Sequence, residues 1–593
     1  MSNFSLVITG IGPWGLAVLD RLIYKAKKEV NCSFKVFIID PNISGEGVHD
    51  TQQPDYLLLN TVTGQVNSFS AETFSNKPLD GAKTFLEWVR ITHDSECQPG
   101  SFLSRKLFGM YLKYVYSTLK QNLPNNITLI EKHTCAIDIQ TINDEKIRIS
   151  CESGDHIDAN NIFICTGHGI QTKHVENKRK NVFSPYPICK FENIIRPNET
   201  VGVMGMGLTA VDVVSSLTEG LGGSFYELPD GSLQYERSGK EPIIYSFSRI
   251  GKLFSCRPEK SLDLASKYSP IFCIPSRLSD KEVLDFKKDI FPAIAAEMLA
   301  AYSMRKASIL DGEHAESALR EMFSKLTPEQ VLESKNTLLS HVDGFDPESL
   351  LLSKSKPKVN NPVELRNMVI SHLQHDVNES LKGEALSPYK HSLEMLRVVR
   401  DFIREGVNNY RLNAESHNDF FSFIAPRISS LIVGPPVSRG REWLALIKAG
   451  VLRFDLGPNP DLHCSIEHDY WVARSTVLKT QHTHQLNYLI EGFIYNNPRD
   501  EIQSPLISNM LKNGICSLHQ SRNYSSIRVD NNNHPLDATG LPVSKITILG
   551  TPSEGSTYFN HYLPSPRSRA QAFKSADRAL NEMFHCHVKS EYL

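Results

Sequence analysis

The feature that most constrains this chain is a glycine pattern near its start, Gly10-Ile11-Gly12-Pro13-Trp14-Gly15. The pattern follows an apolar run of strand type at 6–9 and precedes apolar residues at helical spacing. In this order Gly10 permits a tight turn, Gly12 lets the backbone approach a pyrophosphate, and Gly15 lets helix and strand pack closely. The helix N-terminus then faces the phosphate charge. The turn therefore predicts a dinucleotide site, with Pro13 and Trp14 as part of it.

A second apolar strand, 34–39, ends on Asp40. A carboxylate in this place accepts hydrogen bonds from a ribose 2′-OH, so Asp40 favours FAD or NAD over a 2′-phosphorylated nucleotide. The alternative is a glycine-rich turn that binds nothing. The order of strand, turn, helix, strand and acid argues against that alternative.

A second unit of the same kind begins with the strand 200–204. It continues into Gly205-Met206-Gly207-Leu208-Thr209-Ala210, in which Ala210 takes the third small position that the fingerprint permits. We therefore expect Gly205, Gly207, Leu208, Thr209 and Ala210 to contact a second dinucleotide. Two such units in one chain are much harder to obtain by accident than one.

The strand that follows the second turn, 243–249, ends in Ser248 and Arg249 where an NAD site would carry an acid. A guanidinium can pair bidentately with a ribose 2′-phosphate. Arg249 therefore favours NADPH over NADH in this unit. The alternative is that Arg249 is an ordinary surface cation.

Length and composition indicate a multidomain globular protein. At about 150 residues per domain, 593 residues suggest three or four units. Hydrophobic residues make up 40% and charged residues 22%, and the net charge of −2 gives no case for nucleic acid or an anionic membrane as a partner. We expect a cytoplasmic protein, because we find neither a signal peptide nor an apolar run of roughly 18 residues.

The cysteines separate two functional classes. The 11 cysteines are odd in number and include no C-x-x-C pair, which favours reduced thiols over a disulfide framework. Flavoprotein disulfide reductases need a close redox-active pair, so the sequence argues against that class.

The fold class that these segments predict is α/β, with two Rossmann-like units and a large helical insert. We assign residues 1–195 to the N-terminal part of an FAD-binding domain and 196–278 to an NAD(P)H-binding domain. Residues 279–430 form the helical insert, with helices at 282–304, 314–326, 361–373 and 390–405. Residues 431–593 complete the nucleotide domains and return to the FAD domain. Strands at 127–130, 136–139 and 147–150 suit a small antiparallel sheet.

Three more segments supply candidate cofactor contacts. Asn60 follows an apolar run and either bonds the flavin edge or starts a turn by bonding its own backbone. Thr166 and Gly167 end a strand where small residues leave room for a dinucleotide, and His168 beside them reads as a polar loop residue. Gly550 and Glu554 end a late strand before a helix at 568–584, whose N-terminus would favour negative charge on reduced flavin.

The sequence predicts neither a metal site nor a catalytic triad. His482 and His484 lie two residues apart and supply only two ligands. The pair His585 and His587 lies close to the end of the chain and is a weaker candidate. Catalytic residues therefore stay unassigned.

Taken together, the two glycine turns and the segments 58–61, 165–168 and 549–555 resemble the bacterial FAD-NAD(P)-binding proteins. These are relatives of the class B and N-hydroxylating flavoprotein monooxygenases, and the family includes enzymes similar to nitrosuccinate-forming aspartate N-monooxygenase. The resemblance spans nearly the whole chain. It does not cover the long insert or the stretch 481–484. The start of the chain is where such proteins bind FAD.

The resemblance implies FAD and NADPH as cofactors, and O2 and a small polar molecule as substrates. NADPH would reduce FAD, O2 would add to give a C4a-peroxyflavin, and the distal oxygen would pass to an amine or another nucleophile. The cofactor carries this chemistry, while the protein orients the reactants and excludes water. The alternatives are a flavin-dependent oxidoreductase with another electron acceptor and a non-enzymatic flavin-binding partner protein.

The sequence leaves the place of the insert and the oligomeric state open. The insert follows the NADPH unit, so its helices either cap the junction of the two nucleotide units or build an oligomer contact. We favour the cap, because oxygen chemistry at a flavin needs shelter from water.

Overall fold

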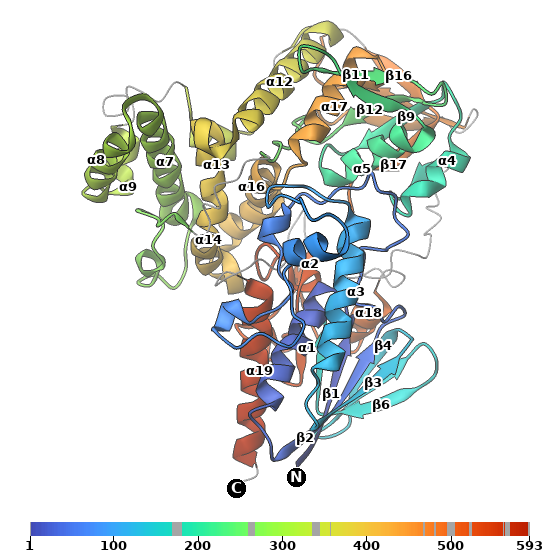
Figure 1. Cartoon of the computed structure of the whole chain (residues 1–593), viewed down its shortest axis with the longest axis vertical. Helices are drawn as coiled ribbons and strands as arrows, with labels where there is room; N and C mark the ends of the chain where they lie inside the picture. The colour runs from blue at the N-terminus through green and yellow to red at the C-terminus, as the bar shows by residue number, and fades with distance from the viewer. Residues whose placement is uncertain are drawn as a thin grey trace.

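The computed structural model describes residues 2–168, 181–258, 267–334, 344–355, 357, 359–465, 469–479, 482–494, 504–520, 525–560, 563 and 570–590. Two parallel sheets, each with helices around it, form the lower and the upper right parts of the molecule, and helices fill the upper left part (Figure 1). The predicted α/β class with two Rossmann-like units is confirmed. None of the helices in the described ranges is long and apolar enough to cross a membrane.

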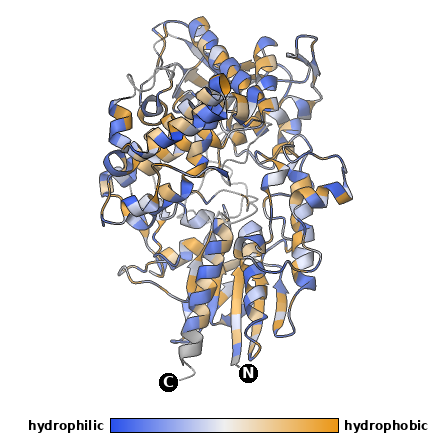
Figure 2. Ribbon diagram, turned by 60° about the vertical axis from the view of Figure 1, so that its left-hand side comes forward, coloured by the Kyte–Doolittle hydropathy of each residue, from blue (hydrophilic) through white to orange (hydrophobic). Residues whose placement is uncertain are grey.

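The first sheet has the strand order β20-β7-β1-β2-β3, and all its pairs are parallel. Its strands are β1 (Ser2–Thr9), β2 (Cys32–Ile39), β3 (Ile127–Lys132), β7 (Asn161–Ile164) and β20 (Ile546–Ile548). The strands are largely hydrophobic (Figure 2) because helices or loops cover both faces, as parallel sheets require. Helices α1 (Pro13–Ala26) and α19 (Gln571–Ser590), from the two ends of the chain, lie side by side (Figure 1).

One strand lies elsewhere than the sequence suggested. We expected 127–130 in the small antiparallel sheet, and this is wrong: β3 pairs with β2 over six positions, from Phe34↔Ile127 to Ile39↔Lys132. The helix that precedes it, α3 (Arg105–Gln121), makes the crossover that a parallel neighbour needs. The small sheet consists of β4 (Ala136–Thr141), β5 (Ile147–Cys151) and β6 (His156–Ala159).

The second sheet has the order β13-β12-β9-β17-β8 and is also parallel. Its strands are β8 (Val182–Phe183), β9 (Thr200–Met204), β12 (Ile243–Phe247), β13 (Leu452–Arg453) and β17 (Tyr488–Glu491). Helix α5 (Leu208–Ser216) follows β9, as the second fingerprint predicts. Segments from 182 to 491 thus build this unit, and our proposed domain boundaries stay a prediction.

The helical insert has a hydrophobic core of its own. Most of its helices begin at a polar cap or a proline, as at Asn361 before α12 and Ser387 before α13. Its helices are α7 (Phe291–Asp311), α8 (Glu313–Ser324), α9 (Pro328–Glu333), α11 (Pro347–Leu352), α12 (Pro362–Leu386), α13 (Pro388–Val398), α14 (Arg400–Val407), α15 (Ala414–Asp419) and α16 (Ala425–Ile432). Two π-helical turns, Phe286–Ile290 and Phe420–Ile424, precede α7 and α16. Tyr558 and Phe559 from the C-terminal segment belong to the same core.

The remaining elements are small. They are α2 (Phe85–Thr92), α4 (Phe191–Ile194), α17 (Val437–Lys448), α18 (Pro505–Lys512), the hairpins β10 (Ser224–Glu227) with β11 (Leu233–Glu236) and β18 (Leu518–Gln520) with β19 (Ser525–Ile527), and the antiparallel sheet β14 (Asp461–Ser465), β15 (Tyr470–Arg474) and β16 (Thr483–Leu486).

A buried ion pair joins the two nucleotide units. Arg105, at the start of α3 in the first unit, donates from Nη1 and Nη2 to the carboxylate of Asp212 in α5 of the second, at 2.5 and 3.1 Å. Tyr186 donates to the same carboxylate at 2.5 Å. This bidentate pair fixes the relative position of the two glycine turns.

Candidate functional site

The first glycine turn leaves no room for side chains at two of its positions. Gly10 has φ +83°, and a Cβ there would lie 2.5 Å from the carbonyl oxygen of Cys165 at the end of β7. A Cβ at Gly15 would lie 2.1 Å from the carbonyl oxygen of Gly10. Helix α1 begins at Pro13 with Gly12 as its N-cap. Strand, turn and helix are therefore as close as the fingerprint requires.

The two small residues after β7 lie against this turn. A Cβ on Gly10 would come within 3.1 Å of the Cα of Thr166, and Gly167 has φ +62° with nothing within 4 Å of its own Cβ position. The structure thus brings Thr166 and Gly167 to the same sheet edge as the glycine turn.

Asp40 lies at the end of β2 beside the turn. Its carboxylate accepts hydrogen bonds from the backbone N–H groups of Ile11 and Asn42, both at 2.9 Å. Burial raises the pKa of Asp40, and these two hydrogen bonds oppose the rise. The side chain therefore holds the turn together, at the place where the sequence predicts the ribose contact.

A loop that sequence reasoning did not assign covers the turn. The Cα of Gly47 is 3.4 Å from a Cβ built on Gly12. Glu46 beside it is buried and forms an ion pair with Lys113 of α3 at 3.0 Å. The run Gly45-Glu46-Gly47 soon after Asp40 was the available signal, because paired glycines mark a close backbone approach.

The C-terminal segment reaches the same place. Gly550 has φ +82°, and a Cβ there would lie 2.9 Å from the indole of Trp14, whose Nε1 donates to the carbonyl of Asn560 at 3.3 Å. Trp14, Gly550 and Asn560 line a small hollow with Gln571, the first residue of α19. The predicted helix start at 568 lies outside the described residues.

Glu554 makes different contacts from those expected of a flavin neighbour. Its buried carboxylate accepts hydrogen bonds from the backbone N–H groups of Phe559 at 3.0 Å and Asn560 at 2.7 Å. Burial raises its pKa to about 7. Glu554 therefore fixes its own loop, and its contact with a cofactor stays a prediction.

The second glycine turn is as crowded as the first. A Cβ at Gly205, which has φ +139°, would lie 2.4 Å from the carbonyl oxygen of Gly492, and one at Gly207 would lie 3.0 Å from the ring of Phe254. Ala210 is fully buried, and a Cβ at Gly492 would lie 3.0 Å from its methyl group. Leu208 and Thr209 begin α5. Gly492, at the end of β17, was not assigned from the sequence because it lies almost three hundred residues from this turn.

Arg249 lies two residues beyond the end of β12 and is exposed. The N–H of Gly205 donates to the carbonyl of Phe247, the last residue of that strand, at 2.7 Å. Arg249 therefore follows closely on the strand end that bonds the second glycine turn, and its side chain is accessible to a ligand. Its pairing with a phosphate stays a prediction.

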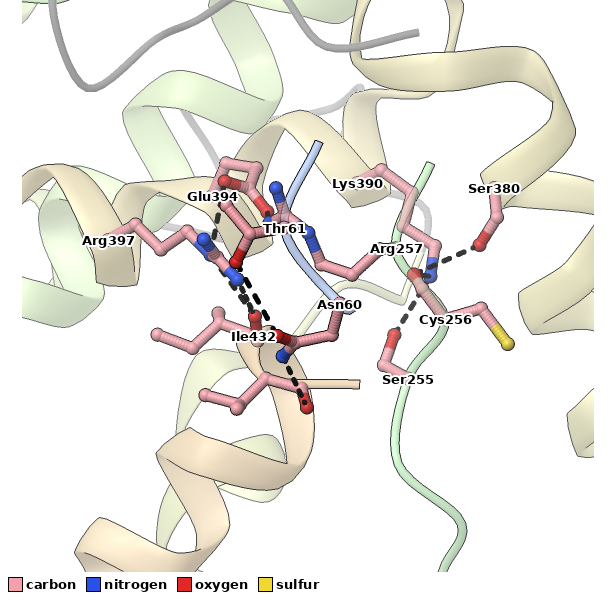
Figure 3. Close-up of polar contacts among 11 residues, drawn as sticks. Asn60, Thr61, Ser255, Cys256, Arg257, Ser380, Lys390, Glu394, Arg397 and Ile432 are labelled. Atoms are coloured by element: carbon pink, nitrogen blue, oxygen red, sulfur yellow. Dashed lines mark hydrogen bonds and ion pairs between the residues drawn. The ribbon is translucent and has the colours of Figure 1, made fainter. Parts of the chain in front are cut away.

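Asn60 lies where the FAD unit meets the insert (Figure 3). Its Nδ2 donates to the carbonyl of Val433 at 3.4 Å, and its Oδ1 accepts from the hydroxyl of Thr61 at 3.4 Å. Both hydrogen bonds are long and weak. The side-chain amide of Asn60 thus makes no strong hydrogen bond to a described residue, and its contact with flavin stays a prediction.

Beside Asn60, a buried network holds the chain segment that leaves the NADPH unit. Lys390 of α13 donates to the hydroxyl of Ser255, the carbonyl of Cys256 and the carboxylate of Asp376 at 2.8, 2.9 and 2.7 Å. Asp376 also accepts from the N–H of Cys256 at 2.6 Å, and Ser380 donates to the Cys256 carbonyl at 3.2 Å. Helices α12 and α13 of the insert therefore both bind residues 255–256 through hydrogen bonds (Figure 3).

The next residue, Arg257, is the largest fully buried side chain in the described part of the chain. Its Nη1 donates to Glu394 of α13 at 2.5 Å, and Arg397, one turn further along, donates from Nε to the carbonyl of Ile432 at 3.1 Å. Sequence reasoning missed these residues. The signal was the spacing of Lys390, Glu394 and Arg397, which puts three charges on one face of a helix that is otherwise rich in apolar residues.

Of the histidines considered for a metal, His482 and His484 do face each other, with their Nε2 atoms 2.8 Å apart, and Asp455 lies close to both. An N–H···N hydrogen bond between the two rings accounts for this spacing. Burial lowers the pKa of His484 to about 4, which keeps it neutral. The absence of a metal stays our prediction. The side chain of His587 lies outside the described residues.

The residues at the first turn fit a dinucleotide. Gly10 and Gly15 have no room for side chains, and α1 begins directly after Gly12. Asp40, Thr166 and Gly550 surround the turn. Backbone N–H groups at a helix start are the donors that a pyrophosphate needs.

Comparison with known families and proteins agrees with this geometry. Residues 7–169 match the family described as FAD-NAD(P)-binding. The L-aspartate N-monooxygenase (nitrosuccinate-forming) of Streptomyces davaonensis is 26% identical, over 93% of this chain and 92% of the relative. The nitrosuccinic acid synthase of Aspergillus oryzae is 25% identical, over 93% and 88%. Among solved structures, the ornithine N-hydroxylase of Kutzneria sp. 744 is 12% identical, covers 99% of this chain and 100% of its own, and has a TM-score of 0.45. The family resemblance and the predicted FAD and NAD(P) cofactors are confirmed.

Proposed function

We propose that this chain, a relative of the L-aspartate N-monooxygenases whose residues 7–169 form an FAD-NAD(P)-binding domain, hydroxylates the amine nitrogen of a small amino acid with NADPH and O2. The observation that carries the proposal is the pair of glycine turns, each at the carboxyl end of a parallel sheet and joined by the Arg105–Asp212 pair. An enzyme that passes electrons from one dinucleotide to another must bind both and bring their reacting rings together.

The residues of the first unit would hold FAD. The N–H groups that follow Gly12 would bind the pyrophosphate, Asp40 the ribose, and the segments at Asn60 and Gly550 would border the ring. When bound, the flavin supplies hydride acceptance and oxygen activation. Gly205 and Gly207 would bind the pyrophosphate of NADPH, and Arg249 its 2′-phosphate.

The position of the helical insert also supports the proposal. Its helices α13 and α16 bring Glu394, Arg397 and Ile432 close to Asn60 (Figure 3), so the insert would lie over the place where the two cofactors meet. We propose that it caps this junction and keeps water from the reacting groups. A cytoplasmic location and the lack of nucleic-acid and membrane partners remain predictions from the sequence.

The proposal is tested by mixing the FAD-loaded protein with NADPH, O2 and a panel of amino acids and diamines. We expect one class of amine to speed NADPH consumption while it lowers release of hydrogen peroxide, and the N-oxygenated product to appear in step. NADPH consumption that ignores every amine, with electrons passing to a quinone or a protein instead, would support an oxidoreductase with another acceptor.

A further inference from the structure

Arg257 is 1% exposed, and one edge of its guanidinium has no partner among the described residues. Nη1 donates to Glu394, whereas Nε and Nη2 are buried and make no hydrogen bond to any described residue. Leaving charged donors buried without acceptors is strongly unfavourable, so such groups in folded proteins normally meet an acceptor.

The two unpaired donors share one edge of the guanidinium, where their N–H bonds point the same way. That edge matches the two oxygens of a carboxylate. The chain itself shows the match on its surface, where Nε and Nη2 of Arg148 donate to the two carboxylate oxygens of Asp158 at 2.8 and 2.9 Å. Arg257 thus presents the same fork inside the protein.

The charge around the fork also favours an anion. Glu394 is shared between Arg257 and Arg397, whose Nε lies 3.5 Å from its second oxygen. Two guanidinium groups and one carboxylate leave one positive charge. Burial, and next the charge of Arg257, lower the pKa of Arg397 to about 9, which shows that the two cations repel each other. An added carboxylate would relieve that repulsion.

The fork is held rigidly beside the place predicted for the flavin. Lys390 and Asp376 bind the backbone and side chains of residues 255–256 directly before it. Asn60 donates to Val433, the residue after Ile432, and Ile432 accepts from Arg397 (Figure 3). A ligand on the fork would therefore meet both the insert and the FAD unit.

We propose that the Nε and Nη2 edge of Arg257 binds a carboxylate of the substrate in bidentate fashion, so that the enzyme selects amino acids and rejects amines that carry no carboxylate. This inference rests on the proposed function, which makes the bound carboxylate that of a substrate. Arg397 and Glu394 act as positioning residues that hold the charge and orientation of Arg257.

The test compares Arg257→Met with the wild type and with Arg277→Met, an exposed arginine just before the insert, after FAD content and thermal unfolding have been matched. The substrates are L-aspartate and its two monoamides, L-asparagine and L-isoasparagine. We expect kcat/KM for L-aspartate to fall roughly thirtyfold or more in Arg257→Met and to stay unchanged in Arg277→Met. The monoamide that lacks the carboxylate bound by the fork should be as poor a substrate for the wild type as L-aspartate is for Arg257→Met. It should lose nothing further in Arg257→Met. Which of the two monoamides behaves in this way identifies the carboxylate that the fork binds.

A change of less than threefold for L-aspartate in Arg257→Met, or an equal loss for all three compounds, would overturn the inference. If Arg257→Met does not fold, Arg257→Lys keeps the charge but not the fork and should lose at least tenfold. Wild-type protein that uses both monoamides as well as L-aspartate overturns the inference without any variant.

The failure of the proposed function is read separately, by calorimetric titration of the FAD-loaded protein with succinate. Succinate binding that depends on Arg257, without turnover of any amine, would uphold the carboxylate site and refute the hydroxylation. Turnover of amines with no role for Arg257 would do the reverse.

Discussion

Gly12 is the residue at which a side chain would most directly test the first cofactor site. A Cβ at Gly12 has only ordinary contact with Gly47, so the fold should survive substitution, but the methyl groups of Gly12→Val would enter the space between turn and pyrophosphate. We expect purified Gly12→Val to have lost most of its FAD absorbance. Lys240→Ala, at an exposed position outside both turns, is the control and should keep its flavin. Full flavin content in Gly12→Val would show that FAD binds elsewhere.

Asp20 in α1 makes stability depend on pH. Burial raises its pKa from 3.8 to about 6, and hydrogen bonds from Ser70 and the charge of Arg21 oppose this rise only in part. The folded state therefore binds the proton more tightly than the unfolded state. The stabilisation is complete below pH 3.8 and is lost as the pH rises through 6.

Asp20→Asn cannot ionise, so it should gain stability relative to the wild type as the pH rises from 4 to 7. At about 1.4 kcal/mol per pKa unit, the difference should change by about 3 kcal/mol over that window. Denaturant unfolding of both proteins at several pH values measures it. A difference that does not vary with pH would mean that Asp20 is charged in the folded protein.

Arg249 decides the nucleotide preference if it binds the 2′-phosphate. We expect wild-type protein to prefer NADPH, and Arg249→Ala to lose about 1.5–3 kcal/mol of NADPH binding while NADH binding stays unchanged. Rates of flavin reduction by each nucleotide measure this. Arg148→Ala, which removes an exposed arginine of the first unit, is the control. Equal use of both nucleotides by the wild type would refute the assignment.

At the scale of elements, the pair Lys390–Asp376 fastens α12 and α13 to the segment 255–256. Both side chains are largely buried, so removing one partner leaves an unpaired charge in the interior. We expect Lys390→Met to cost about 3–5 kcal/mol of unfolding free energy. Lys325→Met, which breaks an exposed pair with Glu321, should cost less than about 0.5 kcal/mol. Similar losses in the two variants would contradict the described network.

The elements that the sequence predicted are those with strong local patterns. Strand β1, the first turn and α1 follow from adjacent residues, and so do β9 and α5, because apolar periodicity and glycine position are local signals. The partner of β3 was predicted wrongly, since an apolar strand of six residues suits either sheet and only the crossover through α3 decides.

The junction was largely invisible in the sequence for the opposite reason. Asn60, Arg257, Glu394 and Arg397 meet only after three units have packed together, and no single segment contains more than two of them. Gly47 and Gly492 were missed in the same way, because each packs against a glycine turn that lies elsewhere in the sequence.

In the whole molecule, contacts between distant segments hold the three units in one arrangement. Arg21 of α1 pairs with Asp577 of α19 at 2.8 Å, which ties the start of the chain to its end. Tyr558 and Phe559 enter the core of the insert, so the C-terminal segment links the FAD unit to the helices above it. In the proposed arrangement, the FAD unit, the exit of the NADPH unit and the insert would enclose the junction, as a water-excluding site requires.

The most direct test of this account is the electron balance of a single reaction. FAD-loaded protein should be supplied with limiting NADPH, air and L-aspartate, and the N-oxygenated amino acid and hydrogen peroxide should be quantified together. The account predicts that most of the NADPH oxidised appears as N-oxygenated product, and that omitting the amino acid shifts the electrons to peroxide. Recovery of all the electrons as peroxide with L-aspartate and with every other amine tested would contradict it.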